Sequence, residues 1–74
     1  MSSLTEQKVR KQLGIKIKEL RNHAGLSQEN LSESIHVTSN YLGFVEQGIR
    51  SPSLSFLTRI ATKLKVEVSE LFKK

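Results

Sequence analysis

The 74-residue sequence contains no cysteine, no aspartate and no tryptophan, and it has a single proline. Without cysteine there is no disulfide and no thiolate chemistry, which is compatible with the cytosol. No apolar run approaches the ~18 residues of a membrane-spanning helix, and no signal-peptide hydrophobic region is found. We therefore expect a cytoplasmic protein that does not enter a membrane.

The side chains on which most enzymes depend are also scarce. The two histidines, His23 and His36, are separated along the chain, and there is no phosphate-cradling glycine loop and no cluster of metal ligands. We therefore expect no enzymatic activity and no cofactor or metal.

Positive charge is abundant by contrast. Twelve lysines and arginines stand against seven glutamates, which gives a formal net charge of +5. Such a balance favours an anionic partner such as nucleic acid, although a merely soluble basic protein has the same composition. A chain of this size has room for one domain, which we place over 1–74, and buries only about 60% of its unfolded surface. Dimerisation would add to that small core.

Two helix starts lie close together in the middle of the chain. Ser27 and Thr38 each offer a hydroxyl that can accept a hydrogen bond from the first turn of a following helix. We expect helices over 28–35 and 39–47, joined by a turn too short for them to lie antiparallel. The stretch 27–47 therefore reads as a helix-turn-helix.

The second of these helices separates into two faces at about 100° per residue. The face expected to pack carries Tyr41, Leu42 and Val45, whereas the outer face carries Ser39, Asn40, Gly43 and Gln47, with Phe44 at its edge. Ser39 and Asn40 are short polar side chains that can reach base edges, and Asn pairs bidentately with adenine. The alternative is that they are ordinary surface residues.

Gly43 and Phe44 need their own explanation. Glycine inside a helix costs about 1 kcal/mol relative to alanine, so we expect Gly43 to let the exposed backbone approach a groove closely. An exposed Phe44 would contact a thymine methyl. Alternatively, Phe44 tucks back into the core.

Three more helices are expected outside this pair. After a disordered start over 1–5, with Thr5 as a possible cap, a helix over 6–24 has an apolar stripe at Val9, Leu13, Ile17, Leu20 and Ala24. Ser53 caps a fourth helix over 54–64, whose core residues are Leu57, Ile60, Ala61 and Leu64. A short fifth helix fits 69–72.

The charged side chains of these helices are expected to face water. Lys8, Arg10 and Lys11 form a solvated face or make general phosphate contacts, and Arg59 and Lys63 face solvent. Gly14 weakens the first helix slightly.

The motifs in register are Ile17-Lys18-Glu19-Leu20-Arg21, Gly25-Leu26-Ser27-Gln28, Leu31, Tyr41-Leu42, Val45-Glu46-Gln47-Gly48, Pro52-Ser53 and Leu57. Together they resemble the Cro/cI-type (XRE) helix-turn-helix family over about 13–72. The resemblance implies an all-α, compact five-helix, lambda-repressor-like DNA-binding domain, with the helix-turn-helix at helices 2 and 3.

The resemblance also implies roles for individual residues. Arg21 and Glu46 match the family's ion pair, whose alternative is two independently solvated charges. Gln28, at the first turn of helix 2, matches a phosphate-binding glutamine. His36 stands where many relatives have glycine, in a position that often needs a left-handed backbone.

The remaining candidates lie around the second helix of the pair and near the C-terminus. Thr38, Arg50 and Ser51 are expected to hold DNA phosphates, with the backbone N–H groups of the loop taking part. Alternatively, Arg50 reaches into a minor groove. Of the apolar residues near the C-terminus, we expect Leu71 in the core and Val68 or Phe72 at a dimer interface.

The leading hypothesis is a sequence-specific double-stranded DNA-binding regulator that acts as a homodimer on a two-fold symmetric operator. It would occupy a promoter, by blocking or touching RNA polymerase, and it resembles restriction–modification controllers and small phage or plasmid repressors. The alternative is an antitoxin or coactivator-type protein-interaction module for which DNA binding is secondary.

Overall fold

The computed structural model describes residues 5–73, and every regular element in that range is helical. The α-helices are α1 (Glu6–His23), α2 (Gln28–Ser34), α3 (Ser39–Glu46) and α4 (Leu54–Leu64), followed by a 3-10 helix, η1 (Val68–Phe72). The all-α expectation is confirmed. The expectation of five α-helices is wrong in its last member, because a five-residue segment closes only short i→i+3 turns, as from Glu70 N–H to the Glu67 carbonyl.

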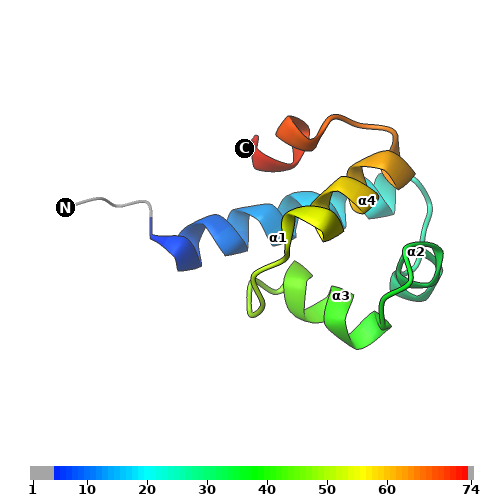
Figure 1. Ribbon diagram of the computed structural model, residues 1–74, viewed down its shortest axis with the longest axis horizontal. Coiled ribbons are helices and arrows are strands. Elements are labelled where there is room, and N and C mark those ends of the chain that lie inside the picture. The colour runs from blue at the N-terminus through cyan, green and yellow to red at the C-terminus, as the bar shows by residue number, and fades with distance from the viewer. Residues whose placement is uncertain (1–4, 74) are drawn as a thin grey trace.

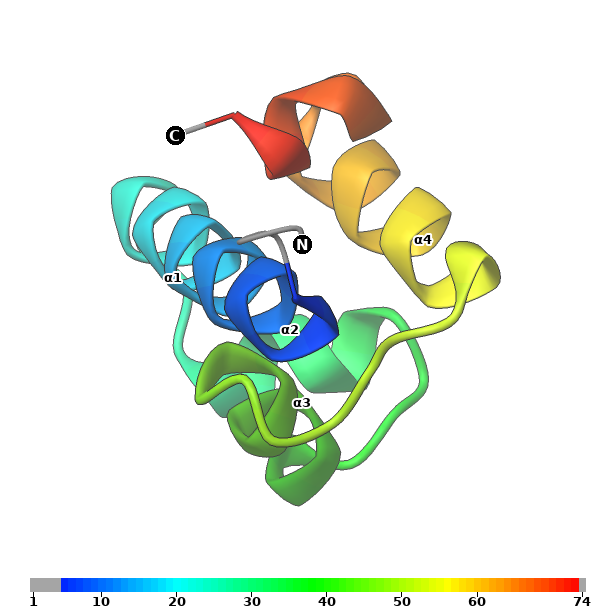
Figure 2. The ribbon, with the colours of Figure 1, turned by 90° about the vertical axis from the view of Figure 1, so that its left-hand side faces the viewer.

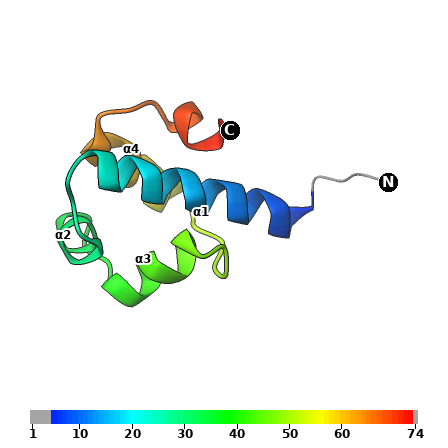
Figure 3. The same cartoon turned by 180° about the vertical axis from the view of Figure 1, so that it is seen from behind.

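The helices surround α1, which runs the length of the molecule (Figure 1). α2 and α3 lie together on one side of it, while α4 and the returning η1 lie on the other. The view from behind shows the same order (Figure 3). α1 contacts α3, α4 and η1, so it is the element against which the helix-turn-helix is held.

The four α-helices begin as expected. Their N-caps accept a backbone hydrogen bond from the residue three positions later; these caps are Thr5, Ser27, Thr38 and Ser53. A cap of this kind stabilises a helix by about 1 kcal/mol. Residues 1–4 of the expected disordered start lie outside the described residues.

The core combines the apolar stripes of all the helices. Its buried members are Leu13, Ile17, Leu31, Ile35, Leu42, Val45, Phe56, Leu57, Ile60, Ala61 and Leu71. The largest, Phe56, was assigned no role from sequence. Ala24, the last member of the apolar stripe expected for the first helix, is exposed, because α1 ends at His23 and Ala24 is its C-cap.

Gly14 marks the closest approach between α1 and α3. A Cβ there would lie 2.5 Å from the carbonyl oxygen of Glu46 and would also collide with that of Val45. Both obstacles are backbone atoms, which cannot rotate away. Gly14 is therefore required by packing, which its local helix propensity did not reveal.

Two arginines expected to face water also hold helix ends: Arg59 is exposed as expected, whereas Arg10 is half-buried. Arg10 Nε donates to the carbonyl of Gly48 at 3.1 Å, and its Nη1 pairs with Glu6 at 3.1 Å. Arg59 Nη1 donates to the carbonyl of Ile35 at 2.6 Å. The first contact ties α1 to the end of α3, and the second ties α4 to the end of α2.

Within the described residues, no helix has the length and apolar character needed to cross a membrane.

Candidate nucleic-acid interface

The turn between α2 and α3 contains a residue in the left-handed backbone conformation, at which α2 ends. His36 has φ 63°, and the N–H groups of His36 and Val37 donate to the carbonyls of Glu33 and Ser32 at 3.2 and 2.9 Å. This pair of bonds is the usual ending of a helix at a left-handed residue, for which glycine is preferred. The expected left-handed backbone is present, with an exposed histidine in the place of glycine.

A buried ion pair fixes the angle of α3. Arg21 Nε donates to Glu46 Oε2 at 2.7 Å and Nη2 to Oε1 at 3.2 Å, and only 8% and 3% of the two side chains is exposed. Arg21 Nη1 also donates to the carbonyl of Leu26 at 2.7 Å. The alternative of two solvated charges is therefore wrong. The end of α1 holds the end of α3 through charge-assisted bonds.

Gln28 belongs to the same network. Its Nε2 donates to Glu46 Oε1 at 2.9 Å, so the first turn of α2 is joined to the last turn of α3. The amide has a second N–H, and the backbone N–H groups of Gln28 and Glu29 have no intrahelical partner, whereas that of Asn30 donates to the Ser27 hydroxyl. The phosphate contact expected of Gln28 thus has to use these groups.

The exposed side of α3 differs from the one predicted. Asn40 and Gln47 are exposed and Phe44 is 41% exposed, so Phe44 does not tuck into the core. Ser39 is half-buried. We call Asn40, Phe44 and Gln47, at i, i+4 and i+7, the α3 strip. Gln47 was placed on the outer face from its wheel position but was given no base-reading role.

Gly43 is not on the surface, contrary to prediction. It is buried, and a Cβ built on it would lie 3.6 Å from Gln28 Oε1. The helical wheel places Gly43 outward, but the side chain of Gln28 reaches across from α2 and covers it. Its backbone therefore does not offer an open approach to a groove.

The loop after α3 places the side chain of Arg50 beside Tyr41, in the first turn of that helix. Gly48 has φ 79°, and the exposed Arg50 lies with its Cζ 5.8 Å from the centre of the Tyr41 ring. The Arg50 N–H points to the carbonyl of Phe44 at 3.4 Å, so the expected free backbone donor is wrong at this residue. Ser51 is exposed.

Thr38 keeps a donor for a ligand. Its hydroxyl oxygen accepts the N–H of Tyr41 at 3.0 Å, and a hydroxyl group that accepts one bond can still donate its own hydrogen. The residue is exposed at the N-terminus of α3.

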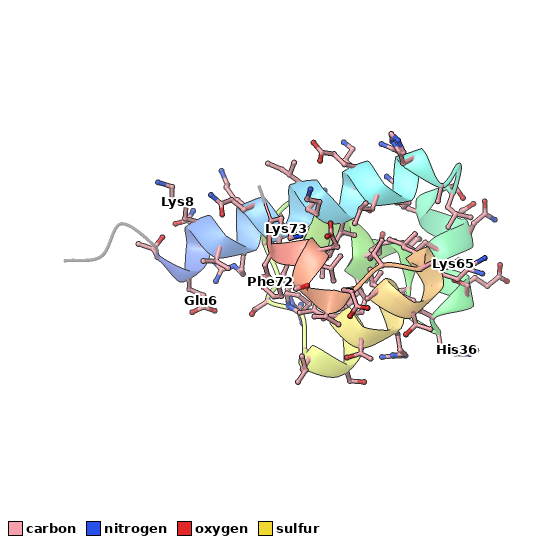
Figure 4. The ribbon with its side chains drawn as sticks, turned by 90° about the horizontal axis from the view of Figure 1, so that it is seen from above. Glu6, Lys8, His36, Lys65, Phe72 and Lys73 are labelled. Carbon is pink, nitrogen blue, oxygen red and sulfur yellow. The ribbon has the colours of Figure 1, made fainter. Side chains whose placement is uncertain are left out.

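The C-terminal apolar residues divide between core and surface. Leu71 is fully buried as expected, whereas Phe72, which Figure 4 labels on η1, is 51% exposed. Val68 is half-buried and packs against the core.

Lys73 donates to Glu70 Oε2 at 2.8 Å, and this hydrogen bond lowers the pKa of Glu70 and raises that of Lys73.

Known proteins are similar to this chain in sequence. A helix-turn-helix family model, HTH_3, matches residues 17–71. The HTH-type transcriptional regulator YgzD of Bacillus subtilis is 35% identical over 57 residues, which cover 77% of this chain and 86% of that protein.

Solved structures are similar as well. The restriction-modification controller protein C.AhdI from Aeromonas hydrophila is 40% identical, with a TM-score of 0.82, and the match covers 85% of this chain and 96% of that one. The DNA-binding domain of BldD is 31% identical, with a TM-score of 0.79 over 99% of this chain and 100% of that one.

Proposed function

Because the chain belongs to the HTH_3 helix-turn-helix family, we propose that it is a sequence-specific transcriptional regulator that binds double-stranded DNA as a homodimer. The α3 strip is the observation that carries this proposal. Its side chains project from one side of a helix that is otherwise packed against α1, α2 and the core. The major groove of DNA is wide enough to admit such a helix.

Base reading falls to the α3 strip and its N-terminal neighbour. Asn40 is exposed in the first turn, where an amide can pair with adenine, and Phe44 offers an apolar edge to a thymine methyl. Gln47 is the third exposed member and carries the same amide chemistry as Asn40. Ser39, although half-buried, begins the helix beside them.

Phosphate contacts would flank this strip on both sides. Gln28 and the start of α2 border it on one side, where free backbone N–H groups and the helix dipole attract an anion. Thr38 lies at the start of α3, and Arg50 and Ser51 follow its end. Such contacts set the position of the protein on DNA without reading sequence.

A second copy of the chain would use the side of the molecule that Figure 2 turns toward the reader, on which the loop after α3, the start of α4 and η1 are all visible. This region includes Ile49, Leu54 and Phe72, which are 57%, 72% and 51% exposed. Large apolar groups in water are a reason to associate. Val68 contributes less, because it already packs against the core. Two recognition helices would then enter major grooves about 34 Å apart.

The similarity to C.AhdI over nearly its whole length supports the narrower role of a restriction–modification controller or a small repressor. Such a regulator acts in the cytoplasm by occupying a promoter, and it either blocks RNA polymerase or contacts it.

Selection of bound sites from a random duplex library tests the function. The purified protein is incubated at physiological salt with unlabelled competitor DNA, and an inverted repeat is the expected result. If no motif is recovered and binding vanishes as salt rises, the binding is non-specific and due only to the net positive charge. That result would favour a protein-interaction module of the antitoxin or coactivator type.

A further inference from the structure

We propose that Tyr41 is a positioning residue for Arg50, holding its guanidinium group beside the recognition helix so that α3 meets DNA with a fixed positive charge at its flank. This inference rests on the proposed DNA-binding function. It gives Tyr41 a role beyond packing, because its ring decides where the charge of the loop lies.

The path of the chain brings the two residues together. Arg50 follows the end of α3, but Tyr41 lies in the first turn of that helix, nine positions earlier. The left-handed Gly48 reverses the chain, and the Arg50 side chain lies back over the ring at 5.8 Å from Cζ to centroid. This distance is within the range in which an aromatic face attracts a cation.

The ring of Tyr41 is itself fixed by a contact with the core. Tyr41 meets the buried Phe56 edge to face, with ring centroids 5.2 Å apart and an interplanar angle of 87°. Its backbone N–H is fixed by the hydroxyl of Thr38. Phe56, Tyr41 and Arg50 therefore form a continuous series of contacts from the core to the surface. An arginine on an exposed loop otherwise samples many rotamers, and these contacts remove much of that freedom before DNA binds.

The charge of Arg50 remains available to a ligand. Among residues 5–73, the ion pairs engage Arg10, Arg21 and Lys73, and none involves Arg50. A ring face attracts the cation without neutralising it, so the guanidinium can still donate to a phosphate. Tyr41 and a phosphate would thus hold the same group from two sides.

Binding to the selected operator provides the first test. Tyr41→Phe keeps the ring and should bind like the wild type. Tyr41→Leu and Tyr41→Met remove it, and each should weaken binding about two- to fivefold, the effect of one exposed cation–ring contact. In an Arg50→Ala background the same changes should have no further effect. Equal losses in both backgrounds, or a loss in Tyr41→Phe, would overturn the inference.

A measurement without DNA separates this inference from the function on which it rests. In the free protein, ring current should displace the NMR signals of the Arg50 Cδ protons, and the displacement should persist in Tyr41→Phe and vanish in Tyr41→Leu. An undisplaced signal in the wild type would overturn the inference even if DNA binding is specific. A displaced signal in a protein that binds no duplex specifically would instead show that the proposed function fails, and the DNA role of Tyr41 with it.

Discussion

Arg21 and Glu46 lie 25 positions apart and form a two-bond ion pair with both side chains buried. The remaining polar groups of the pair are also used, since Arg21 binds the Leu26 carbonyl and Glu46 accepts from Gln28. No buried side-chain nitrogen or oxygen in the described part of the chain lacks a partner. The network therefore joins the end of α1, the start of α2 and the end of α3, and the angle of the α3 strip depends on it.

Replacing Glu46 with alanine should destabilise the fold strongly. Arg21 would remain buried with its charge unpaired, which costs about 3–5 kcal/mol in the free energy of unfolding. Urea denaturation measures this change. The matched control is Glu6→Ala, which removes the other partner of an arginine pair. Because 74% of the Glu6 side chain is exposed, its loss should cost less than about 1 kcal/mol. Similar small losses in both variants would mean that the buried pair does not hold α3.

Gly14→Ala should also destabilise the protein, against the local preference for alanine in a helix. The added Cβ would collide with the carbonyl oxygens of Val45 and Glu46, and forced overpacking of this kind costs about 1–3 kcal/mol or more. Gly43→Ala is the control, because its Cβ would meet Gln28 at an ordinary 3.6 Å. That variant should be more stable by up to about 1 kcal/mol. Denaturation curves of the two variants should therefore shift in opposite directions, and a stabilised Gly14→Ala would rule out the close crossing.

The features that sequence predicted are those that depend on neighbouring residues. A capping hydroxyl acts on an N–H three positions away, so Thr5, Ser27, Thr38 and Ser53 could each be identified from the residues that follow them. Apolar periodicity likewise depends only on helix geometry. For this reason the starts of all four α-helices and most of the core were correct.

The errors concern contacts between residues far apart in the chain. Gly43 points outward on an isolated helix, and only the docking of α2 brings Gln28 over it. Arg10 has the pattern of a solvated residue, yet it reaches a carbonyl 38 positions away. Such outcomes depend on the angle and separation of packed helices, which no local pattern contains. The Arg21–Glu46 pair is equally distant, and it was expected only because a resemblance to a known family supplied it.

His36→Gly should stabilise the protein. A left-handed backbone costs an L-residue roughly 1–2 kcal/mol, whereas glycine adopts φ 63° freely but loses more entropy on folding. The net gain should be roughly 0.5–1 kcal/mol in the free energy of unfolding. Ser34→Gly is the control, because Ser34 lies at the end of α2 and has no positive φ. Its free energy of unfolding should fall by about as much as that of His36→Gly rises. A destabilised His36→Gly would indicate that the imidazole makes a contact of its own.

Asn40 and Arg50 should respond differently to alanine if one reads bases and the other holds a phosphate. Asn40→Ala should lose about 1–3 kcal/mol of binding free energy on the preferred operator and should relax the preference at one base pair. Arg50→Ala should weaken binding to all duplexes alike and should reduce the slope of log affinity against log salt by about one. Titrations of both variants against the operator, a scrambled duplex and a salt series separate the two effects. Equal losses of Asn40→Ala on every duplex would remove it from the base readers, and an unchanged salt slope would remove Arg50 from the phosphate contacts. Because Asn40 belongs to the α3 strip and Arg50 follows its end, an exchange of these two outcomes would show that the strip faces DNA in a different orientation.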